Sequence, residues 1–151
     1  MKLSKQGEYG LRAMLYFAAH PDGRRLRSKT IAQQERISIK FLEQILARLR
    51  KTGLLVSQKG SRGGYQLAKP TDQIMLAEVI RAIDGPLSPW GEGDYLRKLV
   101  EKADTHCGLY KVLLEVRDAI ASVLEKTTLM DVVRKTEECL QEKKKNPMYY
   151  I

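Results

Sequence analysis

The sequence predicts a mainly α-helical chain with one small β-hairpin and a long helix in its second half. Three observations predict this fold class. Apolar residues recur at helical spacing in several separate stretches, three glycines cluster at residues 60–64, and one late helical stripe continues for more than two heptads. The chain has 151 residues, of which 43% are hydrophobic, and this suffices for a folded core.

Three helices are predicted in the first third of the chain. The first covers residues 4–20, where Leu11, Met14, Leu15 and Ala18 form one apolar stripe before Pro21 stops the helix. A short helix and a longer one follow over residues 28–35 and 38–52, and Gly53 suits the position after the last turn. The predicted N-caps of the three helices are Ser4, Ser28 and Ser38.

The third helix carries two distinct faces. Its predicted core stripe consists of Ile39, Leu42, Ile45, Leu46 and Leu49. The opposite face consists of Lys40, Glu43, Gln44, Ala47, Arg48 and Lys51, and such amide, carboxylate and cationic groups can hydrogen-bond to base edges. A merely solvated polar face is the alternative. The short helix just before it, joined by a three-residue turn at 35–37, favours a helix-turn-helix.

A β-hairpin is predicted directly after the third helix. Residues 54–56 and 65–67 are strand-like and flank the glycine-rich stretch "KGSRGG". A nucleotide-binding phosphate loop would carry GxxxxGK[ST] and open a helix, whereas this loop leads into a strand. We therefore expect a wing with a sharp tip at Gly63 and Gly64, from which Lys59, Ser61 and Arg62 meet DNA phosphates or a groove.

Charge is distributed unevenly along the chain. Residues 1–70 hold 15 Lys and Arg against 4 Asp and Glu, whereas residues 71–151 hold 12 against 14. A basic half joined to a near-neutral half indicates that the first half binds a polyanion, most simply double-stranded DNA. The predicted DNA-binding set is completed by Lys2, Lys5, Ser28, Lys29, Ser38 and Tyr65.

Several other classes of protein are not supported. No run of about 18 apolar residues is present, and the first ten residues lack the apolar segment of a secretory signal, so we expect a cytoplasmic protein with no membrane partner. Neither a nucleophile–base pair nor paired carboxylates stand out, so catalysis is not predicted. The two cysteines, Cys107 and Cys139, are too sparse for a structural zinc site.

The second half predicts a dimer. A short helix over residues 76–85 ends at Gly85-Pro86, a loop with two prolines follows, and helix resumes near Leu96. The long helix that comes next has an apolar stripe that exceeds what a chain of this length can cover, so a second subunit is expected to cover it. The stripe consists of Leu109, Val112, Leu113, Val116, Ala119, Ile120 and Val123. A last helix capped by Thr127 or Thr128 precedes a polar linker, "QEKKKNP".

These patterns divide the chain into four predicted parts. Residues 1–84 form a winged helix-turn-helix DNA-binding domain, and residues 85–107 a sensor or connector loop region. Residues 108–142 form the dimerisation helices, and residues 143–151 a C-terminal tail.

The chain resembles the Rrf2 family of bacterial winged-helix repressors over nearly its whole length. The resemblance rests on "KLSKQGEYGLRAMLYFA", "SIKFLEQILARLRKTGLLVSQKGSRGGYQLA", "AEVIRAIDGPLSP" and "VRDAIASVLEKTTLMDVV". It implies a homodimer on a pseudo-palindromic operator, with the third helix in the major groove, the wing against the minor groove and the long helices crossing.

The resemblance also bears on cofactors. Many members hold an iron–sulfur cluster on three cysteines before the long helix, and this chain has only Cys107 there. That departure argues against a cluster and against any metal site, including one formed by Cys107, His106 and Glu8. The alternative function is a redox- or iron–sulfur-sensing regulator that uses Cys107.

Within the family, "DGPLSP" and the ending "MYYI" resemble the cluster-free branch that governs cysteine metabolism. This implies a partnership with cysteine synthase, and the tail residues Tyr149, Tyr150 and Ile151 are expected to bind it through an apolar anchor and a terminal carboxylate. The alternative is that the tail packs on its own dimer.

Overall fold

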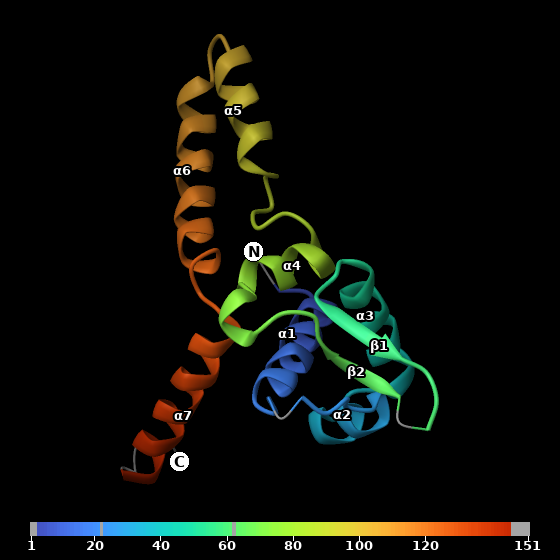
Figure 1. Ribbon diagram of the computed structural model, residues 1–151. Coiled ribbons are helices and arrows are strands. Elements are labelled where there is room, and N and C mark those ends of the chain that lie inside the picture. The colour runs from blue at the N-terminus through green and yellow to red at the C-terminus, as the bar shows by residue number, and fades with distance from the viewer. Residues whose placement is uncertain (1–2, 22, 62, 146–151) are drawn as a thin grey trace.

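The computed structural model describes residues 3–21, 23–61 and 63–145. Helices α1, α2, α3 and α4 and a two-stranded wing form a compact body (Figure 1). Helices α5 and α6 lie side by side and project from it as an arm, and α7 extends in another direction. The elements are α1 (Lys5–Ala18), α2 (Ser28–Glu35), α3 (Ile39–Lys51), β1 (Leu55–Gln58), β2 (Gly64–Leu67), the 3-10 turn η1 (Thr71–Gln73), α4 (Leu76–Asp84), α5 (Gly93–Lys102), α6 (Cys107–Leu124) and α7 (Leu129–Lys145). The mainly α fold with one small β-hairpin is confirmed.

The body surrounds one hydrophobic core. Helix α1 lies at its centre and packs against α2, α3, α4, β2 and α7. The core side chains that solvent does not reach come from five helices, each of which turns one apolar face inward, and from the segment between η1 and α4. They include Met14, Ile31, Leu42, Leu46, Leu49, Ile74, Val79 and Leu129.

The predicted helix starts are confirmed in part. The Ser4 hydroxyl accepts a hydrogen bond from the Gly7 amide at 2.8 Å, as an N-cap should. Ser28 was expected to cap α2 but is its first helical residue, and Arg27 occupies the cap position. Ser38 does precede α3, although its side chain makes no capping hydrogen bond there. Ile39 was predicted to be buried and is 41% exposed, because it begins the helix beyond the edge of the core.

The wing comprises β1, β2 and their connection, residues 55–67. The strands are antiparallel, and Leu55 pairs with Leu67 at the base while Gln58 pairs with Gly64 near the tip. Leu26 forms an isolated antiparallel bridge with Tyr65, through two backbone hydrogen bonds of 2.8 and 2.9 Å. The predicted hairpin is therefore confirmed, and it is fixed to the segment that precedes α2.

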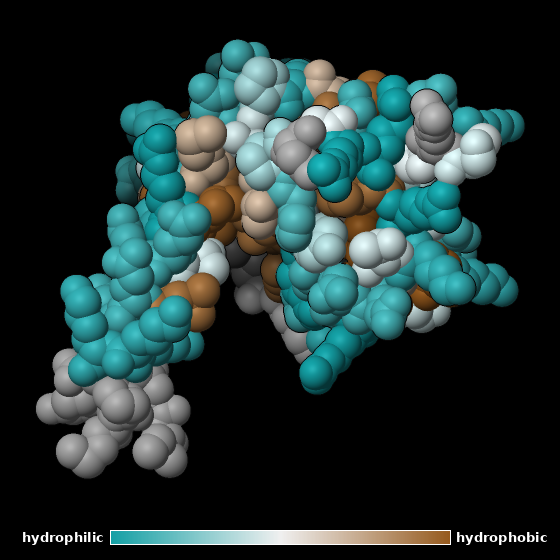
Figure 2. All heavy atoms as spheres, turned by 60° about the horizontal axis from the view of Figure 1, so that its bottom comes forward, coloured by the Kyte–Doolittle hydropathy of each residue, from teal (hydrophilic) through white to brown (hydrophobic). Residues whose placement is uncertain are grey.

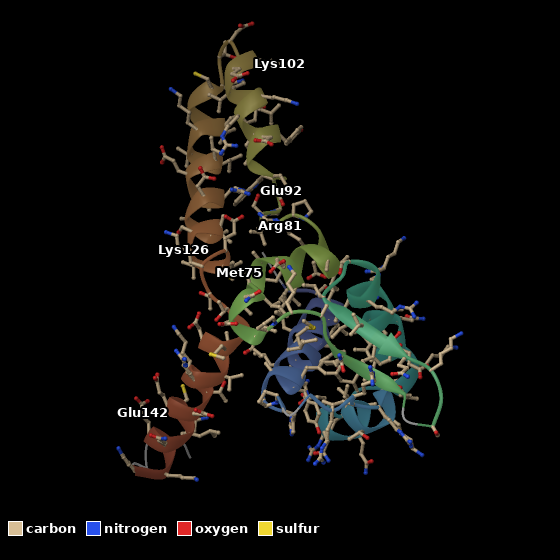
Figure 3. The ribbon with its side chains drawn as sticks, viewed as in Figure 1. Met75, Arg81, Glu92, Lys102, Lys126 and Glu142 are labelled. Carbon is tan, nitrogen blue, oxygen red and sulfur yellow. The ribbon has the colours of Figure 1, made fainter. Side chains whose placement is uncertain are left out.

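The arm, residues 93–124, is attached to the body by ion pairs. The Arg81 side chain on α4 binds Glu92 at 3.2 Å and Glu125 at 2.6 Å, just before α5 and just after α6. Arg117 on α6 binds the other oxygen of Glu92 at 2.7 Å. Hydrogen bonds from Arg81 and Arg117 hold the pKa of the Glu92 carboxyl below its ordinary value. Figure 3 shows Arg81 and Glu92 close together at the base of the arm.

The last helix differs from its prediction at one end. Thr128 and Asp131 form a reciprocal capping arrangement at its start, since the Thr128 amide donates to Asp131 at 2.9 Å and the Asp131 amide donates to Thr128 at 3.1 Å. The expected polar linker after residue 140 is instead helical as far as Lys145. Its Gln, Glu and Lys residues are good helix formers, and lysines suit a helix C-terminus.

Among the described residues, no helix is both long and apolar enough to cross a membrane. Figure 2 shows that hydrophilic residues cover most of the lower face of the molecule, while hydrophobic residues are visible mainly in the interior between them.

We predict that Gly64→Ala destabilises the protein far more than Gly60→Ala. Both glycines have φ values that disfavour a side chain, +145° and +106°. A Cβ on Gly64 would also lie 2.7 Å from the Leu26 carbonyl oxygen, whereas one on Gly60 meets nothing within 4 Å. We expect urea unfolding to show a loss of about 1 kcal/mol at Gly60 and about 3 kcal/mol at Gly64. Equal losses would show that contact with Leu26 is unimportant.

Candidate nucleic-acid interface

The exposed face of α3 follows from its buried face. Leu42, Ile45, Leu46 and Leu49 are all buried in the core, which fixes the rotation of the helix. The six residues of the predicted outer face are exposed, namely Lys40, Glu43, Gln44, Ala47, Arg48 and Lys51. The helix therefore presents hydrogen-bonding groups and one small side chain, that of Ala47, on a surface that can enter a major groove.

The spacing between α2 and α3 is fixed by their turn and by one side-chain contact. Arg36 adopts a left-handed conformation with φ of 53°, which ends α2, and the Ile37 amide donates to the Ala32 carbonyl at 2.9 Å. The Ser28 hydroxyl donates to the Glu43 carboxylate at 3.2 Å. Ser28 thus contacts the outer face of α3, so that the first turn of α2 and the exposed row on α3 belong to one surface.

Two of the predicted cations bind other parts of the protein. The Arg48 guanidinium donates to Gln6 at 3.0 Å and to the Ile83 carbonyl at 3.2 Å, which links α3 to α1 and α4. Lys5 forms an ion pair of 3.1 Å with Glu8. The contacts of Arg48 orient α3 relative to α1 and α4, whereas the pair formed by Lys5 lies within α1.

The remaining predicted residues lie on the wing and on α2. Lys59 and Ser61 are exposed in the connection between the strands, and Lys29 is exposed on α2. Gly64 and Tyr65 are half-buried on β2, and Gly63, just before it, is half-buried as well. Lys2 and Arg62 lie outside the described residues, as do Tyr149, Tyr150 and Ile151.

Two arginines that sequence reasoning did not single out contact the wing. Arg50, at the end of α3, donates to the Ser57 hydroxyl at 3.2 Å. Arg27 donates to the Ser61 carbonyl at 2.6 Å. Their positions in the basic stretches "GRRLR" and "RLRK" were visible in the sequence, but their partners lie 7 and 34 residues away and the second could not be guessed.

The residues considered for sensing do not assemble into a metal site. Cys107 is half-buried at the start of α6, and Cys139 is exposed on α7. In the part of the chain that the structure describes, no group of three or more His, Cys, Asp and Glu side chains lies close enough together to hold a metal ion.

A cavity of about 590 Å³ lies where α1, α4, the 86–91 loop and the end of α6 meet. Its lining is largely apolar, with Leu3, Ile80, Leu87 and Leu124 among its residues. The carboxylate on its wall, Asp84, already accepts hydrogen bonds from the Ser4 amide and hydroxyl, so the described lining does not identify a ligand.

The fold and this surface define a winged helix-turn-helix DNA-binding protein. The family model described as "Iron-dependent Transcriptional regulator", Rrf2, matches residues 3–135. The chain belongs to the Rrf2 family of transcriptional regulators, and its family resemblance is therefore confirmed.

Individual relatives agree with this assignment. The transcriptional regulator CymR of Bacillus subtilis is 34% identical over 137 residues, which cover 91% of this chain and 93% of CymR. The solved structure of CymR, described as the global cysteine regulator of that organism, matches with a TM-score of 0.75 and 32% identity, covering 89% of this chain and 98% of that chain. The structure of T. potens IscR matches with a TM-score of 0.74 and 31% identity, covering 92% and 90%. These relatives are transcriptional regulators and not enzymes.

Proposed function

We propose that this chain is a homodimeric repressor that binds a pseudo-palindromic operator and controls genes of cysteine and sulfur metabolism. The proposed mode of DNA binding is inferred from the exposed residues Lys40, Glu43 and Gln44 on α3 and from the wing. Helix α3 enters the major groove, and the wing follows the neighbouring backbone.

Base readout is assigned to the N-terminal half of α3. Gln44 can pair with adenine through its amide, and Glu43 can accept a hydrogen bond from cytosine. Lys59 at the wing and Lys29 on α2 meet phosphates, which positions the helix without reading sequence. Because these contacts release counterions, binding falls steeply with salt concentration.

The dimer is assigned to α6. Leu109, Val112, Val116, Ala119 and Val123 recur at alternating spacings of three and four residues, and all five are exposed in the single chain. Four of them are 41–62% exposed, which is costly for large apolar side chains in such a row. Leu113 and Ile120, from the same predicted stripe, are half-buried against their own chain. The exposed spacing matches one side of a two-helix seam, and the partner is a second copy of α6.

A two-fold dimer sets the form of the operator. Two copies of α3 related by that axis read two inverted half-sites, and successive major grooves on one side of the duplex are about 34 Å apart. The operator is therefore a pseudo-palindrome with half-sites about one helical turn apart.

The regulated genes are inferred from similarity. CymR, described as a global cysteine regulator, matches nearly all of this chain in sequence and in structure. We extend that role to this protein, together with a complex with cysteine synthase in which residues 149–151 participate.

We predict that Gln44→Ala and Lys59→Ala affect DNA binding in different ways. Gln44→Ala reduces the preference for the operator over random DNA by about 1–3 kcal/mol, because it removes a base contact. Lys59→Ala weakens binding to every sequence and lowers the salt slope by about one unit, because it removes a phosphate contact. Fluorescence anisotropy on both duplexes over a salt series measures each quantity. Equal losses on operator and random DNA for Gln44→Ala would contradict base readout.

We predict that Val116→Glu dissociates the dimer. Each subunit would bury a carboxylate in the apolar seam, so the dimer dissociation constant should rise at least about tenfold. Sedimentation velocity over a concentration series measures it. Leu140→Glu is the matched control, because Leu140 is similarly exposed, at 53%, but lies on α7. A dimer that survives Val116→Glu, or dissociates equally with Leu140→Glu, would place the interface elsewhere.

We predict that cysteine synthase binds this protein and that deletion of residues 148–151 weakens the complex. Calorimetry on the intact and shortened chains measures the affinity, and DNA binding by the shortened chain provides the control for folding. Unchanged affinity would show that the tail does not contribute to the binding of cysteine synthase.

Genomic fragments captured by the protein should lie upstream of genes for cysteine and sulfur metabolism. Capture of unrelated regions only would refute the proposed set of regulated genes.

A further inference from the structure

The wing is attached to the rest of the DNA-binding surface along one edge. Leu26 and Tyr65 hold the middle of β2 through their two backbone hydrogen bonds. Gly64, the next residue toward the tip, lies so close to Leu26 that a side chain would collide with its carbonyl oxygen. The backbone around Leu26 therefore lies in close contact with β2 as far as Gly64.

Arg27 extends this attachment to the tip of the wing. Its guanidinium Nη2 donates to the Ser61 carbonyl at 2.6 Å, a contact between residues 34 apart in the sequence. Arg27 is also the N-cap residue of α2, so its backbone position is fixed by the helix that follows. One side chain therefore connects the start of the helix-turn-helix to the connection between β1 and β2.

Among the described residues of the tip, few other contacts hold it. Within the described part of the connection, the backbone hydrogen bond is that from the Gly63 amide to the Gly60 carbonyl, at 2.9 Å. Gly60 faces open space, and the two strands are only four residues long. A hairpin of this size is marginally stable without further contacts, so its tip would sample many orientations.

We propose that Arg27 is a positioning residue for DNA binding: it holds the wing tip at a fixed place relative to α2 and α3, so that Lys59 meets the DNA backbone when α3 lies in the major groove. This inference rests on the proposed function, because that function supplies the contact between wing and DNA. Arg27 acts by reducing the conformational freedom that the wing loses on binding. Direct contact of Arg27 with a phosphate is the competing explanation.

A double-mutant cycle separates the two explanations. If Arg27 acts through the wing, Arg27→Ala weakens operator binding by about three- to tenfold in the native background and by less than about twofold when Lys59 is already alanine. Additive losses in anisotropy titrations would mean that Arg27 contacts DNA independently, which overturns the proposal. Arg25→Ala is the matched control, because it removes the same charge from the same segment and should show no coupling to Lys59.

A second measurement needs no DNA. Amide hydrogen exchange by NMR should become faster at Gly63 in Arg27→Ala, while exchange at Tyr65, whose amide is bonded to Leu26, stays the same. Arg25→Ala should leave both unchanged. If exchange at Gly63 is unaltered in Arg27→Ala, Arg27 does not hold the wing tip and the proposal is overturned. If Lys59→Ala does not affect DNA binding, the wing contact in the proposed function fails, while the exchange result still decides whether Arg27 holds the tip.

Discussion

The close approach of α1 to α4 is the constraint on which the DNA-binding surface depends. A Cβ on Gly10 would collide with the Cδ1 of Ile83, and one on Gly7 would collide with the Asp84 carboxylate. Glycine within a helix costs about 1 kcal/mol relative to alanine, so two in α1 are retained at the expense of helix stability. In return, α4 and α3 both reach α1, since Ile45 on α3 lies within 3.4 Å of the same Cβ position. The exposed face of α3 is thereby set from its buried side.

The two halves of the chain differ in how much of their apolar surface they bury. The body encloses its own core, whereas α6 leaves an apolar row exposed after α5 has covered its other side. Arg81 connects these halves, because it binds Glu92 before the arm and Glu125 after it. Both ends of the arm are thus held by one side chain on α4. Exposed ion pairs individually contribute little to the free energy of folding. An arginine that binds two carboxylates nevertheless also fixes the orientation of the arm relative to α4.

Local sequence signals explain which features could be predicted. The apolar periods of α1, α3 and α6 and the glycines of the wing depend only on neighbours in the chain, and these helices and the hairpin were confirmed. The exposure of Ile39 could not be predicted, because helical spacing does not show where a core ends. The binding of Arg48 to Gln6 and Ile83 and of Arg27 to Ser61 depends on residues 34 to 42 positions away. Such partners are set by tertiary packing, which periodicity does not encode.

The return of the chain from the arm to the body affects the order of folding. The Leu129 side chain is fully buried in the same core as Met14, and its amide donates to the Ile74 carbonyl at 2.9 Å. The Leu76 amide likewise donates to the Thr127 carbonyl at 2.9 Å. During synthesis, the core therefore stays incomplete until the whole arm has left the ribosome. A nascent chain therefore exposes its apolar α6 row before its core has closed, and association of this row with other apolar surfaces competes with completion of the fold.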